Sequence, residues 1–112
     1  MKLVTAILRP HVVGDVVAAL QSVGVSGGTF TEVSGFGHQK GHTEVYRAAE
    51  YDIVLVPKAR LEVVVDDADV DAVFKALEGT VRTGRIGDGK VWVVEVGDVM
   101  RLRTGERGAA AV

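Results

Sequence analysis

A glycine-rich segment that ends in a lysine is the first feature with residue types suited to ligand binding. Gly84, Gly89 and Lys90 match the G-x-x-x-x-G-K part of a phosphate-binding P-loop, but Val91 stands where that motif has Ser or Thr. The residues after Lys90 predict a strand, whereas a P-loop opens a helix, so we reject a P-loop. Two interpretations stay open: a turn whose backbone N–H groups and Lys90 hold a phosphate, and an ordinary tight turn between a helix and a strand.

Two arginines near the C-terminus form a second candidate site. Arg101 and Arg103 are two residues apart, so on an extended segment their side chains would point to the same side. Two guanidinium groups on one face suit a polyphosphate, because each makes paired hydrogen bonds to phosphate oxygens. A solvated basic edge is the alternative interpretation of this pair.

Metal binding is the third kind of chemistry that the residue types allow. His38 and His42 are four residues apart, and Glu44 is close by. A zinc site needs about three or four ligands held on a rigid element. Gly41 lies between the two histidines and argues against a helix there, so the pattern falls short of a zinc site.

Both tyrosines of the chain lie in one polar segment. Tyr46 is followed by Arg47, and Tyr51 is preceded by Glu50. An exposed tyrosine beside carboxylates suits a modification site or an interface anchor, and an ordinary flexible loop is the alternative. No serine lies in a nucleophile motif, so the sequence predicts a protein that is not an enzyme.

The bulk composition excludes several classes of protein. The 112 residues correspond to one domain, and the net charge of −2 lacks the basic excess of a nucleic-acid binder. The absence of cysteine excludes disulfides and thiolate sites, and it favours a cytoplasmic location. No apolar run approaches the ~20 residues of a membrane span, so we expect contact with a membrane only indirectly, through a partner.

The apolar patterns predict the elements that position these residues. Helical spacing and short apolar runs indicate strand, helix, strand, then strand, helix, strand. We expect strands at 2–8, 29–33, 61–65 and 90–96, one helix containing Val13, Val16, Val17 and Leu20, and one containing Val70, Val73, Phe74, Leu77 and Val81, started by Asp66, Asp67 and Asp69. Two such halves predict a ferredoxin-like α+β sandwich, βαββαβ, with both helices on one face of an antiparallel sheet.

The segment between the second and third strands is unusually long. Residues 37–56 have no apolar periodicity, and we expect a mobile loop closed by Pro57 and Lys58. Loops longer than about 12–15 residues are usually functional or disordered. The final predicted strand is apolar at nearly every position, as if both of its faces were buried. This pattern predicts an oligomer whose sheets pack together. We expect residues 101–112 to form a C-terminal segment with an extended piece at 101–105.

These segments together resemble the PII family of nitrogen-regulatory signal proteins. The resemblance runs from Lys2 to Glu106 as one PII-like domain, and the most specific pieces are 35–44, 46–51 and 82–90, namely Gly-Phe-Gly-x-Gln-Lys-Gly-His-Thr-Glu, Tyr-Arg-x-Ala-Glu-Tyr and Arg-Thr-Gly-x-Ile-Gly-Asp-Gly-Lys. Val91-Trp92-Val93 and the stretch 104–108 resemble members from high-GC Gram-positive bacteria.

The resemblance implies a homotrimer with an ATP or ADP site in each cleft between subunits. The nucleotide-binding positions it implies are Thr29, Gly37, His38, Gln39, Val64, Gly87, Asp88, Gly89 and Lys90, with Arg101 and Arg103 from the neighbouring chain. It also implies binding of 2-oxoglutarate by Gln39, Lys40, Gly41, Lys58 and Gly87, and of Mg²⁺ by Gln39 together with ATP and 2-oxoglutarate.

The resemblance further implies a switch that acts through the long loop. Tyr51 matches the tyrosine that is uridylylated or adenylylated in the family, and Tyr46, Arg47, Glu50 and Tyr51 would meet protein partners. The partners implied are an ammonium channel, a nucleotidylyltransferase and regulators of glutamine synthetase. We expect metabolites to shift the populations of loop conformations, and a nucleotide on Tyr51 to block an interface by its charge and bulk.

Two positions depart from the family pattern. His38 stands where the pattern usually has arginine, so we expect ATP affinity to be weaker or to depend on pH. Ala48 stands where the pattern usually has glycine, which reduces backbone freedom. The alternative function is a trimeric metal-binding or structural protein of the same sandwich fold that uses His38 and His42.

Overall fold

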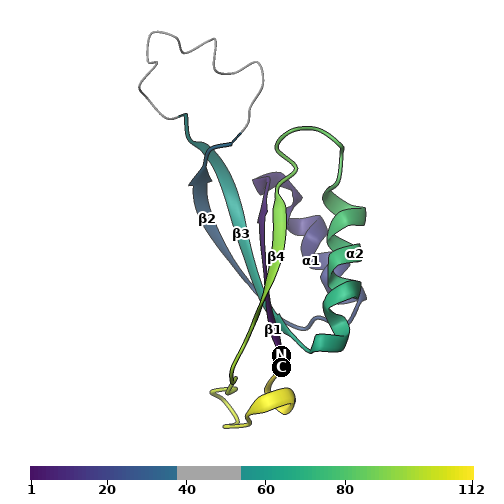
Figure 1. The fold of residues 1–112 in the computed structure, drawn as a ribbon, viewed down its shortest axis with the longest axis vertical. Coiled ribbons are helices and arrows are strands. Elements are labelled where there is room, and N and C mark those ends of the chain that lie inside the picture. The colour runs from purple at the N-terminus through teal and green to yellow at the C-terminus, as the bar shows by residue number, and fades with distance from the viewer. Residues whose placement is uncertain (38–53) are drawn as a thin grey trace.

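The computed structural model describes residues 1–37 and 54–112. Its main elements are β1 (Lys2–Leu8), α1 (Val13–Ser22), β2 (Thr29–Gly35), β3 (Val56–Val65), α2 (Val70–Val81) and β4 (Lys90–Glu95), with short 3₁₀ turns η1 (Pro10–Val12), η3 (Asp67–Asp69) and η4 (Gly108–Ala111). The strands lie in the order β2-β3-β1-β4, every neighbouring pair is antiparallel, and both helices cover one side of the sheet (Figure 1). The predicted ferredoxin-like α+β fold is confirmed.

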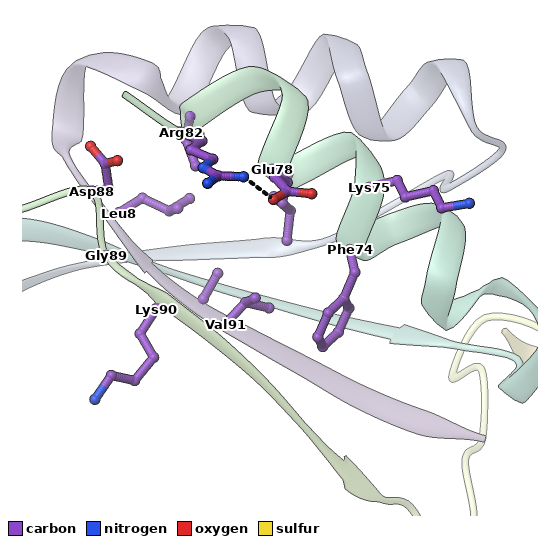
Figure 2. A pocket seen from close by; sticks show the side chains of 12 residues that line it. Leu8, Phe74, Lys75, Glu78, Arg82, Asp88, Gly89, Lys90 and Val91 are labelled. Atoms are coloured by element: carbon purple, nitrogen blue, oxygen red, sulfur yellow. Dashed lines mark hydrogen bonds and ion pairs between the residues drawn. The ribbon is translucent and has the colours of Figure 1, made fainter. Parts of the chain in front are cut away.

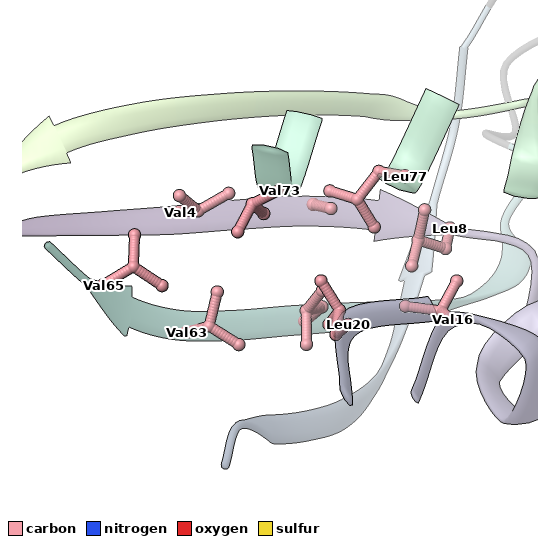
Figure 3. Close-up of a cluster of buried hydrophobic side chains, with 10 residues drawn as sticks. Val4, Leu8, Val16, Leu20, Val63, Val65, Val73 and Leu77 are labelled. Carbon is pink, nitrogen blue, oxygen red and sulfur yellow. The ribbon is translucent and has the colours of Figure 1, made fainter. Parts of the chain in front are cut away.

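The hydrophobic core lies between the sheet and the two helices. Alternate residues of β1 and β3 point to the helix side, as the period of two along a strand requires, and they meet one face of each helix (Figure 3). The buried cluster consists of Val4, Ala6, Leu8, Val16, Leu20, Leu61, Val63, Val65, Val73 and Leu77. Each Val or Leu removed from water in this way contributes about 1.5–3 kcal/mol.

The other face of the sheet has no helix over it among the described residues. Trp92 is 41% exposed and Val94 48% exposed on this open face, while Val91 and Val93 pack against the core. One face of β4 is therefore buried within the chain and the other is not. The predicted packing of sheets between copies of the chain stays a prediction.

The strand register fixes which residues share an end of the sheet. Ile7 of β1 pairs with Lys90 of β4, and Val33 of β2 pairs with Lys58 of β3. At the opposite end, Leu3 pairs with Val64. The first end, where β2 ends and β3 begins, is called the lysine end below.

The predicted start of the third strand was wrong. β3 begins at Val56 rather than at residue 61, so Pro57 and Lys58 lie inside a strand instead of closing a loop. Pro57 pairs with Ser34 of β2, beyond the last β1–β3 pair of Leu8 and Ala59. Proline is tolerated there because, among the described strands, that part of β3 has a neighbour on one side only.

The predicted extended segment at 101–105 was also wrong. Residues 102–104 form a turn, in which Gly105 N–H donates to the Arg101 carbonyl at 2.7 Å and Arg101 N–H donates to the Glu106 carbonyl at 2.8 Å. The turn folds the chain back, so that Met100 bridges to Arg107. The argument that Arg101 and Arg103 point to one side because the segment is extended therefore fails.

Of the described helices, none has the length and apolar character needed to cross a membrane. The triplet Asp66, Asp67 and Asp69 does precede the second helix, although Asp67–Asp69 forms the turn η3 before α2 begins. The Asp67 carboxylate pairs with the amino group of Met1 at 2.7 Å rather than capping the helix.

Candidate functional site

A groove at the lysine end of the sheet brings together residues from five parts of the chain. It has a volume of about 410 Å³ and is lined by Ile7, Gly35, Phe36, Gly37, Lys58, Ile86, Gly87, Gly89, Lys90 and Trp92. Five of the predicted binding positions, Gly37, Lys58, Gly87, Gly89 and Lys90, are therefore adjacent. The end of β2, the start of β3, the turn before β4 and the start of β4 supply them.

The turn before β4 is organised around the carboxylate of Asp88. Oδ2 accepts the backbone N–H groups of Thr83 at 2.7 Å and Gly84 at 2.9 Å, and Oδ1 accepts the Thr83 hydroxyl at 2.5 Å. Oδ1 also accepts a hydrogen bond from Arg9 Nη1 at 2.6 Å. These donors, the Thr83 hydroxyl first, hold the pKa of Asp88 well below its usual range. Asp88 was predicted as a nucleotide contact, and its carboxylate is occupied in shaping the turn.

Two glycines of this turn adopt a conformation that side chains disfavour. Gly87 and Gly89 both have φ of 104°. A Cβ on Gly89 would lie 1.8 Å from the carbonyl oxygen of Ile7, so no other residue fits without moving the backbone. Glycines with positive φ are typical of turns whose backbone N–H groups bind anions.

Two lysines give the groove its charge. Lys58 Nζ donates to the carbonyl oxygen of Gly87 at 3.1 Å, which joins β3 to the turn. Lys90 is exposed and has no ion-pair partner within residues 1–37 and 54–112. Two ammonium groups beside a glycine turn suit an anionic ligand.

A separate apolar cavity lies on the helix side of β4. It measures about 380 Å³ between α2 and the sheet, with Leu8, Phe74 and Val91 among its lining residues, and an ion pair of 2.8 Å between Arg82 and Glu78 at its rim (Figure 2). Gly89 and Lys90 line both this cavity and the lysine groove, although the Lys90 side chain points away from Val91 and Phe74 (Figure 2). Beyond these two shared residues the linings differ, with Trp92 in the groove and Phe74 and Val91 in the cavity.

The remaining described candidates lie at the other end of the sheet. Thr29, Val64 and Arg101 line a cavity of about 390 Å³ beside the carboxyl end of β3. Val64 is six residues along β3 from Lys58, and at about 3.3 Å per residue the two are roughly 20 Å apart. Arg101 there holds Glu106, with 3.2 Å between Nη1 and Oε1, and Arg103 is exposed in the adjoining turn. One chain therefore holds the two groups of predicted residues apart.

Several predicted residues lie outside the described residues. These are His38, Gln39, Lys40, Gly41, His42, Tyr46, Arg47, Glu50 and Tyr51, and their predicted roles stay predictions. Within the part of the chain that the structure does describe, no group of three or more His, Cys, Asp or Glu side chains is placed to hold a metal ion.

Sequence reasoning missed Arg9. It stands between a strand and Pro10 in no recognisable motif, yet its guanidinium reaches Asp88, 79 positions along the chain. No local pattern signals a contact of that separation.

Comparison with known proteins places the chain in a family. Residues 1–106 match the family model described as nitrogen regulatory protein P-II. Proteins named nitrogen regulatory protein P-II from Rhizobium meliloti (strain 1021) and Azospirillum brasilense are 50% and 48% identical, and nitrogen regulatory protein P-II 1 from Escherichia coli (strain K12) is 50% identical, each over the full length of both chains. These names describe a regulatory protein, which confirms the prediction that the chain is not an enzyme. The chain belongs to the P-II family of nitrogen regulatory proteins.

Proposed function

We propose that the chain is a signal protein that binds ATP or ADP and 2-oxoglutarate and reports their levels to partner proteins. Membership of a nitrogen regulatory family supplies the regulatory role. The observation that carries the ligand proposal is the lysine groove, where Lys58, Lys90 and the turn glycines meet although they come from separate elements.

The turn at Gly87–Gly89 has the chemistry that nucleotide phosphates need. The φ values of 104° at both glycines and the close approach of Gly89 to the Ile7 carbonyl oxygen favour glycine at these two positions. Backbone N–H groups of the turn and the Lys90 ammonium group then face the phosphates. The residues present therefore fit a nucleotide di- or triphosphate.

Lys58 has the position expected of a group that binds a dicarboxylate. Its ammonium group already lies in the groove and, within the described residues, donates to the neutral carbonyl oxygen of Gly87. A carboxylate of 2-oxoglutarate is a stronger acceptor than a carbonyl, because the bond then joins two charged groups. Gln39, Lys40 and Gly41 would complete this site, with Gln39 as the protein ligand of a Mg²⁺ ion shared by ATP and 2-oxoglutarate.

The separation of the two ends of the sheet supports a site shared between chains. Thr29, Val64, Arg101 and Arg103 belong to the end of the sheet opposite to Lys58 and Lys90. A nucleotide that uses both groups needs the lysine end of one chain and the other end of a second. We place such sites in a homotrimer, in which the open face with Trp92 and Val94 is also covered.

Signalling then passes through the segment between β2 and β3. Ligands at its base shift the conformations of that segment, and partners bind one set of them. The partners we propose are an ammonium channel, a nucleotidylyltransferase and regulators of glutamine synthetase. The protein would act in the cytoplasm, would meet membranes only through a partner, and would not bind nucleic acid.

Tyr51 would carry the nucleotide modification. Intact-mass measurement on protein from nitrogen-starved cells would show it, and a Tyr51→Phe chain should lack it.

Titration calorimetry with ATP tests the nucleotide site. The chain without substitutions should bind ATP. Lys90→Gln should weaken ATP binding about tenfold or more, because a charge-assisted contact to phosphate is lost. Lys75→Gln is the matched control, since it removes the same charge from α2, outside the groove. Equal affinities for Lys90→Gln and Lys75→Gln would reject the groove as the phosphate site.

A further inference from the structure

We infer that Arg9 is a positioning residue for the phosphate-binding turn: it holds residues 83–89 in the shape that binds nucleotide without itself touching the nucleotide. The inference rests on the proposed function, because it names a residue that acts on the proposed nucleotide site.

The guanidinium of Arg9 donates hydrogen bonds to two acceptors in the turn. Nη1 donates to Asp88 Oδ1 at 2.6 Å, and Nη2 donates to the Ile86 carbonyl oxygen at 3.0 Å. The two acceptors flank Gly87, so the arginine spans this part of the turn. Planar geometry lets one guanidinium hold two acceptors in a fixed relation, which a lysine ammonium group does not do.

Gly87 is packed directly against this guanidinium. A Cβ built on Gly87 would lie 3.0 Å from Arg9 Nη2 and 3.6 Å from Cζ. Gly87, with its φ of 104°, thus packs against the planar guanidinium group of Arg9. Removal of the guanidinium leaves a space beneath Gly87, and the turn can then relax into other conformations.

The position of Arg9 is itself fixed by the chain around it. Arg9 directly follows β1 and has an extended backbone, with φ of −65° and ψ of 141°. Pro10 follows it, and a residue before proline is restricted to such conformations. The core strand β1 therefore carries Arg9 to the turn as part of the rigid sheet.

The contact also balances charge beside the groove. The Arg9 and Asp88 side chains are only 24% and 19% exposed, so they are screened less than a surface ion pair. Without the arginine, the Asp88 carboxylate would stand uncompensated next to bound phosphates and repel them. Both the geometry and the charge of the turn thus depend on Arg9.

The lining of the lysine groove distinguishes positioning from direct binding. Ile86, Gly87 and Gly89 line the groove, and Arg9 is not among its lining residues. The guanidinium contacts the turn through Nη1 and Nη2 instead. The effect of Arg9 on a nucleotide therefore passes through Ile86, Gly87 and Asp88.

The test compares Arg9→Gln and Arg9→Lys with the control Lys75→Gln in the full chain. Lys75 lies on α2, outside both the turn and the lysine groove, and its substitution changes the charge equally. ATP affinity is measured by calorimetry, and amide hydrogen exchange of residues 84–89 is measured without nucleotide. Circular dichroism checks folding, and Arg9→Lys, which keeps the charge, serves if Arg9→Gln does not fold.

Arg9→Gln should bind ATP about tenfold more weakly and exchange faster in the turn, because two charge-assisted hydrogen bonds are lost. Arg9→Lys should show both effects in part, and Lys75→Gln should match the unsubstituted chain within about twofold. Unchanged affinity of Arg9→Gln overturns the inference, as does weaker binding with unchanged exchange, which would mean direct contact. Full affinity in Arg9→Lys also overturns it, since charge alone would then suffice. An unmodified chain that binds no ATP overturns the proposed function, and this inference with it.

Discussion

The ammonium group of Lys58 donates a hydrogen bond of 3.1 Å to the carbonyl oxygen of Gly87. The bond crosses the lysine groove and joins β3, which leads away from the segment at 38–53, to the turn that we propose for phosphates. A dicarboxylate that takes Lys58 away from Gly87 would therefore change the environment of that turn. The two proposed ligand sites thus share a direct contact.

Replacement of Lys58 by glutamine should weaken 2-oxoglutarate binding far more than ATP binding. Lys58→Gln removes the ammonium group that would bind 2-oxoglutarate but leaves Lys90 and the glycine turn in place. We expect 2-oxoglutarate affinity to fall at least about tenfold, with ATP affinity changed less than about threefold. Calorimetry in the presence of Mg-ATP measures both, with Lys75→Gln as the control. A variant that binds 2-oxoglutarate as well as the control does would contradict the assigned role of Lys58.

Mixing two defective chains should restore nucleotide sites. Lys90→Gln and Arg101→Gln each remove one half of a site that we place between chains, so each alone should bind ATP weakly. In refolded mixtures, some clefts combine an intact Lys90 from one chain with an intact Arg101 from another. We expect those clefts to regain the affinity of the unmodified chain in a calorimetric titration. The same chains refolded apart and then combined are the control, and no gain over this control would mean that the site lies within one chain.

Substitution of Gly89 by alanine should destabilise the fold. The new Cβ would lie 1.8 Å from the Ile7 carbonyl oxygen, and the backbone φ of 104° disfavours any side chain. We expect a loss of about 1–3 kcal/mol in the free energy of unfolding, measured with denaturant. Gly79→Ala is the control: its Cβ meets nothing within 4 Å in α2, so it should stabilise by about 1 kcal/mol. Equal effects of the two substitutions would contradict the geometry of the turn.

The network around Asp88 should make stability depend on pH in the acid range. The pKa of Asp88 is held well below its usual range, chiefly by the hydroxyl and N–H of Thr83 and by Arg9. In an unfolded chain the pKa of the Asp88 carboxyl is about 3.9. The contribution of the network to the free energy of unfolding is therefore fully present above that pH and is lost as the pH falls further.

Asp88→Asn removes the charge and keeps the size of the side chain. Its melting temperature should lie below that of the unmodified chain at pH 7, and the difference should narrow as the pH falls below about 4. Thermal unfolding followed by circular dichroism at several pH values measures this difference. A difference that stays constant from neutral to acid pH would show that the carboxylate is not stabilised by its donors.

Local patterns predicted most of the fold. The apolar spacing in 13–22 and 70–81 and the short valine-rich runs placed both helices and the core strands. The start of β3 escaped prediction because Pro57 looks like a strand terminator, and only the register shows that Pro57 pairs with β2 beyond the last pair of β3 with β1. Similarly, the spacing of Arg101 and Arg103 suggested an extended segment, whereas the hydrogen bonds from Gly105 and Arg101 fold it into a turn.

The candidate site was predictable in its residue types but not in its internal contacts. Gly87, Gly89 and Lys90 stood out as a motif, and Lys58 through a resemblance. Arg9 did not, because its partner Asp88 lies 79 positions away and no local period links them. The role of the Asp88 carboxylate as the centre of the turn likewise depends on a hydroxyl and N–H groups whose directions a sequence does not specify.

A titration of 2-oxoglutarate into the protein with and without Mg-ATP tests the central claim most directly. The two proposed sites share Mg²⁺ and the contact between Lys58 and Gly87, so each ligand should raise the affinity of the protein for the other. We predict clear binding of 2-oxoglutarate in the presence of Mg-ATP and at least about tenfold weaker binding without it. Equal affinity under the two conditions would contradict the account of a coupled nucleotide and metabolite sensor.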